Sequence, residues 1–178
     1  MTTSSARTAG PTASPDHNLP VPLTSLLGRA RELAEVGETL RRTRLVTLTG
    51  PGGVGKTRLA LELARDQVGR RADGVWLVDL AAGSGAPDVS HEAARMLGLR
   101  SASEAKATDA LQSYLANRDL LVVLDNCEHV VDQCAELAKA LLTACPGVRI
   151  LVPCQATFAR LTTRRRLRSW TLRFRHEM

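Results

Sequence analysis

Residues 47–61 read TLTGPGGVGKTRLAL and place four glycines and a proline between a short apolar run and a helical pattern. A simple connection needs only one or two such residues, so the others indicate a ligand. Gly50-x4-Gly55-Lys56-Thr57 matches the phosphate-binding loop pattern, and it has the strand before it and the helix after it that the pattern requires. The stretch therefore predicts a nucleotide site.

The residue types in this loop suit polyphosphate chemistry. Glycines allow positive φ and a close approach of the backbone, so that successive N–H groups form an anion nest. The following helix adds unpaired N–H donors at its positive end. Lys56 would reach the β and γ phosphates and the Thr57 hydroxyl would hold Mg²⁺, while Pro51 ends the strand sharply after Gly50. The alternative is a glycine-rich turn with a solvated lysine. The predicted nucleotide-binding residues of the loop are Gly50, Pro51, Gly52, Gly53, Val54, Gly55, Lys56, Thr57 and Arg58.

An acidic residue elsewhere in the chain fits the same chemistry. Asp125 ends LLVVLD, residues 120–125, a continuous apolar run typical of a strand buried on both faces. A carboxylate there could bind magnesium directly or through water, which would make Asp125 and Thr57 the metal residues. The alternative is an aspartate that caps the helix near Val130.

Strand-like and helical segments alternate along the chain. Helical spacing covers 26–42, 56–69, 89–97, 104–117 and 130–145, and strand-like runs cover 45–49, 75–80, 120–125 and 148–152. This alternation predicts an α/β fold with a parallel sheet and helices on both faces.

Four segments together resemble the signal-transduction ATPases with numerous domains, the NB-ARC-like group, in the version found in actinobacterial LuxR-type and SARP-type transcriptional regulators. They are LTSLLGRARELAEV (23–36), RLVTLTGPGGVGKTRLAL (44–61), GVWLVDL (74–80) and LLVVLDNCEHV (120–130). The resemblance implies a P-loop NTPase fold whose bound ATP or ADP sets the state of a larger regulator.

The resemblance also implies roles for residues outside the loop. It places Gly28 and Arg29 over the adenine and ribose, whereas spacing alone gives only a helix start there. In P-loop ATPases the residue after the metal-binding Asp is often an acid that activates water, but here it is Asn126. Glu128 is the candidate general base, with a solvated loop glutamate as the alternative, so the catalytic candidates are Lys56, Asp125 and Glu128.

The likeness stops after residue 152. Where the family has a Thr-Ser-Arg type stretch with a γ-phosphate-sensing arginine, this chain has Pro153, Cys154 and Gln155, and neither Arg160 nor Arg164 stands at the matching position. We therefore expect a disordered segment at 1–22, the P-loop domain at 23–152, and a basic tail at 153–178 outside the family. The fold would be incomplete at its C-terminus.

The formal net charge of +6 belongs to that tail. Residues 160–178 hold seven of the 24 basic residues and one of the 18 acidic residues, so the chain before them is formally neutral. The tail could bind nucleic acid by pairing phosphates and stacking bases on Trp170 and Phe174, or it could lie as a basic helix on a membrane or partner. We favour a third hypothesis, a terminus read in a shifted frame.

Composition excludes other classes. No apolar run approaches the ~20 residues that span a bilayer, and the first 22 residues lack an apolar secretion core. Cys127, Cys134, Cys145 and Cys154 show no CxxC spacing and are expected to be reduced, mostly buried thiols of a cytoplasmic protein.

The leading hypothesis is an ATP- or ADP-binding switch domain that uses Mg²⁺ and acts with regulatory protein partners or by self-association. Losing the sensor arginine should cost hydrolysis more than it costs binding, so we expect nucleotide affinity with little or no turnover. The alternatives are a remnant without function and a nucleic-acid binder that acts through its tail.

Overall fold

The computed structural model describes residues 17–21, 28–81, 88–99, 104–154, 158 and 170–173 of the chain. The elements, in chain order, are α1 (Ala30–Arg42), β1 (Leu45–Thr49), α2 (Lys56–Gln67), β2 (Val75–Asp79), α3 (Val89–Met96), α4 (Glu104–Leu115), β3 (Leu121–Asp125), the 3₁₀ helix η1 (Cys127–His129), α5 (Val131–Ala144), β4 (Arg149–Pro153) and β5 (Trp170–Arg173).

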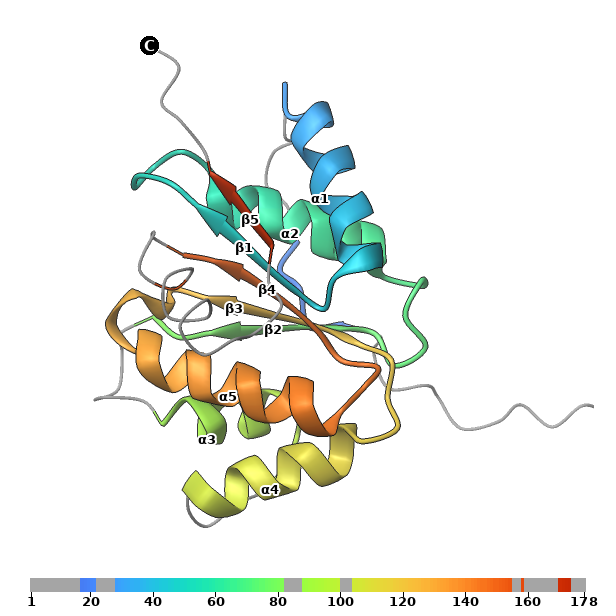
Figure 1. Cartoon of the computed structure of the whole chain (residues 1–178), viewed down its shortest axis with the longest axis vertical. Helices are drawn as coiled ribbons and strands as arrows, with labels where there is room; N and C mark the ends of the chain where they lie inside the picture. Colours follow the sequence, from blue (N-terminus) through green and yellow to red (C-terminus); the bar gives the residue numbers. More distant parts are fainter. Residues whose placement is uncertain are drawn as a thin grey trace, which may run out of the picture.

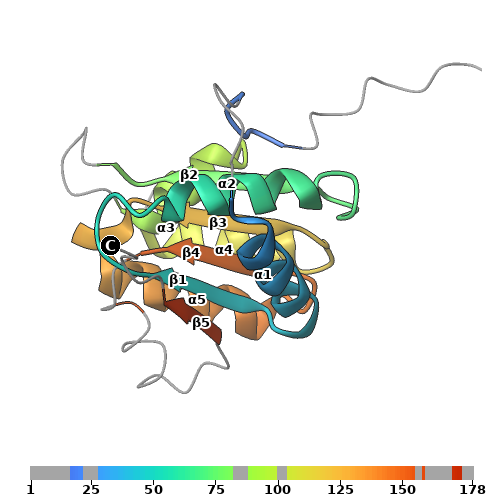
Figure 2. The same cartoon turned by 90° about the horizontal axis from the view of Figure 1, so that it is seen from above.

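The five strands form one sheet in the order β2-β3-β4-β1-β5, and every neighbouring pair is parallel (Figures 1 and 2). Strands β1 and β2 follow one another in sequence but are separated in the sheet by β3 and β4. The connection through α2 therefore crosses the sheet, as parallel strands require. In open sheets of this kind, ligands bind outside the carboxyl ends of the strands.

Helices cover both faces of the sheet, which confirms the predicted α/β class. Helices α1 and α2 lie on one face and α3, α4 and α5 lie on the other (Figures 1 and 2). The core accordingly divides into two clusters. Leu121 and Val123 of β3 belong to the cluster with α1 and α2, whereas Val122 and Leu124 belong to the opposite one. Period-two alternation between two buried faces explains why this strand reads as a continuous apolar run.

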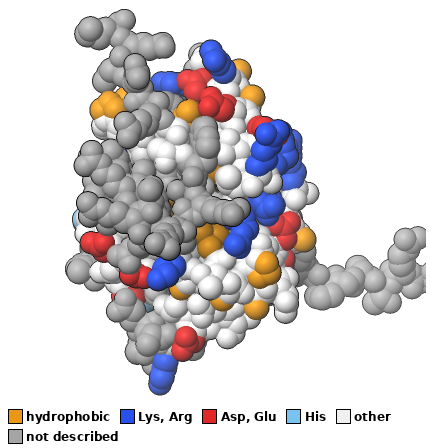
Figure 3. All heavy atoms as spheres, in the orientation of Figure 1, with side chains coloured by type: hydrophobic (Ala, Val, Ile, Leu, Met, Phe, Trp, Pro, Cys, Tyr) orange, Lys and Arg blue, Asp and Glu red, His pale blue; other side chains and the backbone are white. Residues whose placement is uncertain are grey.

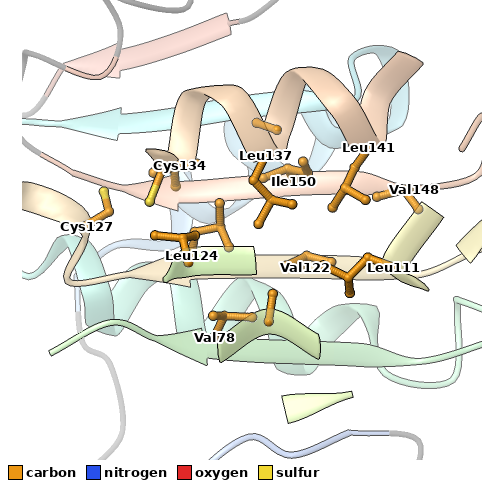
Figure 4. Packing of buried hydrophobic residues seen from close by; sticks show 14 of the residues in the cluster. Val78, Leu111, Val122, Leu124, Cys127, Cys134, Leu137, Leu141, Val148 and Ile150 are labelled. Carbon is orange, nitrogen blue, oxygen red and sulfur yellow. The ribbon is translucent and has the colours of Figure 1, made fainter. Parts of the chain in front are cut away.

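The larger cluster is aliphatic and contains thiols. Figure 4 shows side chains of β3 and β4 packed against Leu137 and Leu141 of α5, with Cys127 and Cys134 at one end. All four cysteines are free and buried, as predicted for structural thiols. The hydrogen bond with the Cys134 thiol, together with burial, raises the pKa of the Cys127 thiol far above its ordinary value. A thiol with so high a pKa is a poor nucleophile, and this agrees with a packing role.

A fifth strand corrects the expectation of four. Trp170–Arg173 pairs in parallel with Val46–Thr49 at the free edge of β1, and the Thr49 hydroxyl donates to the Leu172 carbonyl at 3.2 Å. Part of the stretch expected to be a non-family tail therefore belongs to the sheet. The strand is only four residues long and lies in a stretch with many arginines, so its local pattern did not predict a strand, although Trp and Thr favour one. Arg160, Arg164 and Phe174 lie outside the described residues.

The N-terminal stretch also departs from expectation. Residues 1–22 were predicted to be disordered, but residues 17–21 are placed against β2 and α2, and Leu19 is buried in the core. Residues 1–16 and 22 lie outside the described residues. Residues 23–27 do so as well, and α1 begins at Ala30.

Candidate functional site

The glycine loop joins the carboxyl end of β1 to the amino end of α2. Gly53 and Gly55 have φ of 77° and 84°, in the left-handed region that side chains rarely adopt. A Cβ added at either position would meet no atom within 4 Å, so the requirement for glycine here comes from the backbone conformation and not from lack of space. Gly55 is the N-cap residue of α2, directly before its first residue Lys56.

Lys56 closes this loop. Its side chain is buried, and Nζ donates to the carbonyl oxygens of Gly50 at 3.0 Å and Pro51 at 2.9 Å. The loop is therefore curled around the ammonium group. Among the described residues, the amides of Gly52, Gly53 and Gly55 donate to no protein acceptor. An uncommitted amide group beside a buried ammonium is an arrangement that attracts an anion.

Thr57 and Asp125 lie together, as the metal prediction requires. The Thr57 hydroxyl donates to Asp125 Oδ1 at 3.0 Å, and Asp125 is 5% exposed. Burial raises the pKa of the Asp125 carboxyl, and the hydrogen bond from Thr57 opposes that effect. No group of three or more acidic, histidine or cysteine ligands is present within the described residues. Two oxygens fit Mg²⁺, which prefers a few protein ligands plus waters and phosphate oxygens.

Asn126 and Asp79 form a contact that sequence analysis missed. Asn126 has φ of 56°, and its Nδ2 donates to Asp79 Oδ1 at 2.7 Å. Asp79 pairs in register with Asp125 and its charge contributes to the raised pKa of Asp125. The sequence contained a signal for this contact, because VWLVDL and LLVVLD both place an aspartate at the end of the apolar run. In parallel neighbours these ends meet at one edge.

The remaining predicted residues surround the loop. Arg29 donates from Nη2 to the Val54 carbonyl at 3.4 Å and from Nη1 to Glu32 Oε1 at 2.7 Å, so the Gly28–Arg29 segment is tied to the loop. Gly28 is exposed with φ of 74°. Glu128 is exposed on η1, directly beyond β3.

These elements enclose a cavity of about 580 Å³, within the usual range of ~300–1,000 Å³ for small-molecule sites. The cavity brings together loop residues, the start of α2, the turn after β3 and the strand end of β4. Its lining consists of Pro20, Val21, Gly52, Gly53, Gly55, Lys56, Thr57, Arg58, Leu61, Glu62, Arg65, Glu128 and Pro153. Gly28, Arg29, Gly50, Pro51, Val54 and Asp125 are not in the lining itself.

Two surface properties bear on partners other than a nucleotide, namely membranes and nucleic acids. In the described part of the chain, no helix combines the length and apolar character needed to cross a bilayer. On the face in Figure 3, basic side chains gather on the side of α1 and α2 with acidic side chains among them. This mixture agrees with the neutral charge balance before residue 160.

Curated relatives match this chain over part of longer proteins. The chain is 46% identical over 112 residues to "Putative HTH-type transcriptional regulator Rv0890c" of Mycobacterium tuberculosis, covering 63% of this chain and 12% of that protein. It is 41% identical over 129 residues to "Uncharacterized protein Rv0894" of the same organism, covering 72% of this chain and 33% of that protein. The chain thus spans a minor part of each relative's length.

Solved structures show the same fold at low identity. A signal transduction ATPase with numerous domains and a tetratricopeptide repeat sensor, PH0952 from Pyrococcus horikoshii, superposes with a TM-score of 0.56 at 13% identity, over 90% of this chain and 25% of that one. The Pif1 helicase from Candida albicans gives a TM-score of 0.50 at 16% identity, over 85% and 40% of the two chains.

The family model described as "AAA domain" matches residues 39–161, which include the glycine loop, Asp125 and four of the five strands. With this match over most of its length, the chain belongs to the AAA-domain family of P-loop proteins.

Proposed function

We propose that this domain binds ATP and ADP with Mg²⁺ and acts as the nucleotide-dependent switch of a transcriptional regulator. One observation carries the proposal. Lys56, which holds the glycine loop, and Thr57 line one cavity, and Asp125 accepts a hydrogen bond from Thr57 just outside that lining. A phosphate nest and a pair of hard oxygen ligands would therefore serve the same ligand.

Each group has a defined task in binding. The amides of Gly52, Gly53 and Gly55 would donate to phosphate oxygens, and the Lys56 ammonium would balance their charge. Magnesium would be held by Thr57 and Asp125, and when bound it neutralises charge on the phosphates. Arg29 would support the loop through its contact with the Val54 carbonyl.

Hydrolysis is proposed to be slow in this chain. Phosphoryl transfer depends on positioning and charge neutralisation, and an arginine at the γ-phosphate is worth ~10³–10⁵ in rate. At the end of β4, the cavity lining contains Pro153, which carries no charge, and Cys154 next to it is buried. Glu128 lines the cavity and is the candidate general base, since Asn126 has no acid to offer and donates to Asp79.

The regulatory part of the proposal is supported by the relatives. One of them carries "HTH-type transcriptional regulator" in its name, and a structural neighbour is a signal transduction ATPase with a repeat sensor. In such a protein, nucleotide binding would shift the equilibrium between two states by its differential affinity for them. Contacts with other regulatory domains or with a second copy of the chain would differ between the two states.

The test is a titration of the purified chain with labelled ATP and ADP, with and without Mg²⁺. Lys56→Ala should weaken both nucleotides by at least about tenfold, because it removes a charge-assisted contact worth ~1.5–3 kcal/mol. Lys106→Ala is the matched control, since Lys106 is an exposed lysine on α4. Affinity unchanged in Lys56→Ala would refute nucleotide binding at this loop, and steady hydrolysis abolished by Lys56→Ala would refute the slow-turnover proposal.

A further inference from the structure

The segment His17–Val21, called here the N-terminal strap, is fastened to the edge strand β2 by one side chain. Asn18 Nδ2 donates to the Leu77 carbonyl at 2.8 Å, and Asn18 Oδ1 accepts from the Leu77 amide at 2.6 Å. The carboxamide thus satisfies both main-chain groups of one strand residue, as a neighbouring strand would. His17 adds a parallel bridge to Val75.

Two further contacts carry the strap from β2 onto α2. Leu19 is 8% exposed and packs in the core cluster that α1 and α2 share with the sheet. Arg65 of α2 then donates from Nη2 to the Pro20 carbonyl at 2.7 Å, while its Nη1 donates to Glu62 at 3.2 Å. The strap is therefore fixed at Asn18, Leu19 and Pro20, and these contacts also fix where the next residue, Val21, lies.

The end of the strap forms a wall of the nucleotide cavity. Pro20 and Val21 line it together with Leu61 and Arg65 of α2. The cavity extends along α2 from Gly55 to Arg65, a distance of ~15 Å at 1.5 Å per residue. Val21 is 86% exposed, and within the described residues it is the large hydrophobic side chain that stands out to solvent. An exposed valine beside a proline and a leucine suits a flat apolar ring.

We propose that the N-terminal strap builds the wall that contacts the base of the bound nucleotide, and that Asn18 is the positioning residue that holds this wall in place. This inference rests on the proposed nucleotide binding. The phosphates are held by the loop, so the strap acts on the nucleoside part of the ligand. Asn18 does not touch the ligand and acts through Pro20 and Val21.

The experiment compares ATP with inorganic tripolyphosphate, which has the phosphates and lacks the base. Asn18→Ala removes both hydrogen bonds to Leu77 and should weaken ATP binding by about 3- to 10-fold, because the wall is then no longer held in place before the ligand binds. Tripolyphosphate affinity should stay within about twofold. Val21→Ser should give the same pattern, and because Val21 is exposed this variant leaves folding intact. Asn117→Ala, at an exposed asparagine after α4, is the control and should change neither ligand.

The outcomes separate this inference from the proposed function. Equal losses for ATP and tripolyphosphate, or no loss for either in Asn18→Ala and Val21→Ser, would overturn the role of the strap. A Lys56→Ala variant that keeps both affinities would instead overturn nucleotide binding at the loop. A loss confined to ATP in both strap variants, with Lys56→Ala weakening both ligands, supports the two proposals together.

Discussion

Replacing Gly55 by alanine separates the cost of backbone strain from the cost to ligand binding. Gly55 has φ of 84° at the amino end of α2, and Gly69 has φ of 76° just beyond the carboxyl end of the same helix. A Cβ at either glycine would meet no atom within 4 Å. Gly69→Ala is therefore a control that imposes the same strain away from the cavity.

The expected change in stability follows from the left-handed conformation. An L-residue there costs ~1–2 kcal/mol, and alanine recovers ~0.4–1 kcal/mol because it restricts the unfolded chain. Both variants should lose about 1 kcal/mol of unfolding free energy, or roughly 2–4 °C in Tm for a chain of this size. Differential scanning calorimetry or thermal circular dichroism measures this loss.

The two variants should differ in ligand binding. Gly55 lines the cavity and its amide is among those proposed to face phosphate, whereas Gly69 is absent from the lining. Gly55→Ala should weaken ATP at least about tenfold, equivalent to ~1.4 kcal/mol, while Gly69→Ala should bind as the parent does. If Gly55→Ala keeps ATP affinity within twofold while losing the same stability as Gly69→Ala, the loop is not the phosphate cradle.

Three further results are expected at the residues proposed to bind metal and to act in catalysis. Asp125→Asn should raise the Tm of the metal-free protein, because it removes a buried charge. The same variant should abolish the gain in ATP affinity that Mg²⁺ gives. A lower Tm with the Mg²⁺ dependence intact would contradict the proposal that Asp125 binds the metal. Because the pKa of Asp125 is raised, the folded state binds more protons than the unfolded state between the ordinary aspartate pKa and the raised one. The contribution of Asp125 to the unfolding free energy should therefore increase as pH falls through that window, while the Mg²⁺-dependent part of the ATP affinity decreases. Unfolding and ATP-binding experiments across acidic pH measure both changes, and Asp125→Asn, which should show neither, is the control. Glu128→Gln should leave ATP affinity within twofold and remove whatever slow turnover the chain has, measured by phosphate release in single-turnover conditions, and unchanged turnover would exclude Glu128 as the base.

The sequence determined the features that depend on local pattern. Glycines at the positions that need positive φ, with Lys56 and Thr57 after them, specify the phosphate loop wherever a strand and helix flank it. The apolar run ending in Asp125 indicated a strand buried on both faces, and its alternate residues do divide between the two cores. These features could be predicted because backbone conformation and two-sided burial leave a signature in neighbouring residues.

The tertiary structure decided what depends on residues far apart in the chain. Strand β5 pairs with the free edge of β1, and its four residues are too short a run to predict a strand within a stretch that has many arginines. The N-terminal strap is ordered because Asn18 reaches Leu77, 59 residues away, and the Asp79–Asn126 contact forms because two parallel strands end side by side. Such contacts carry no periodic pattern in the sequence, since their partners become neighbours only when the sheet is assembled.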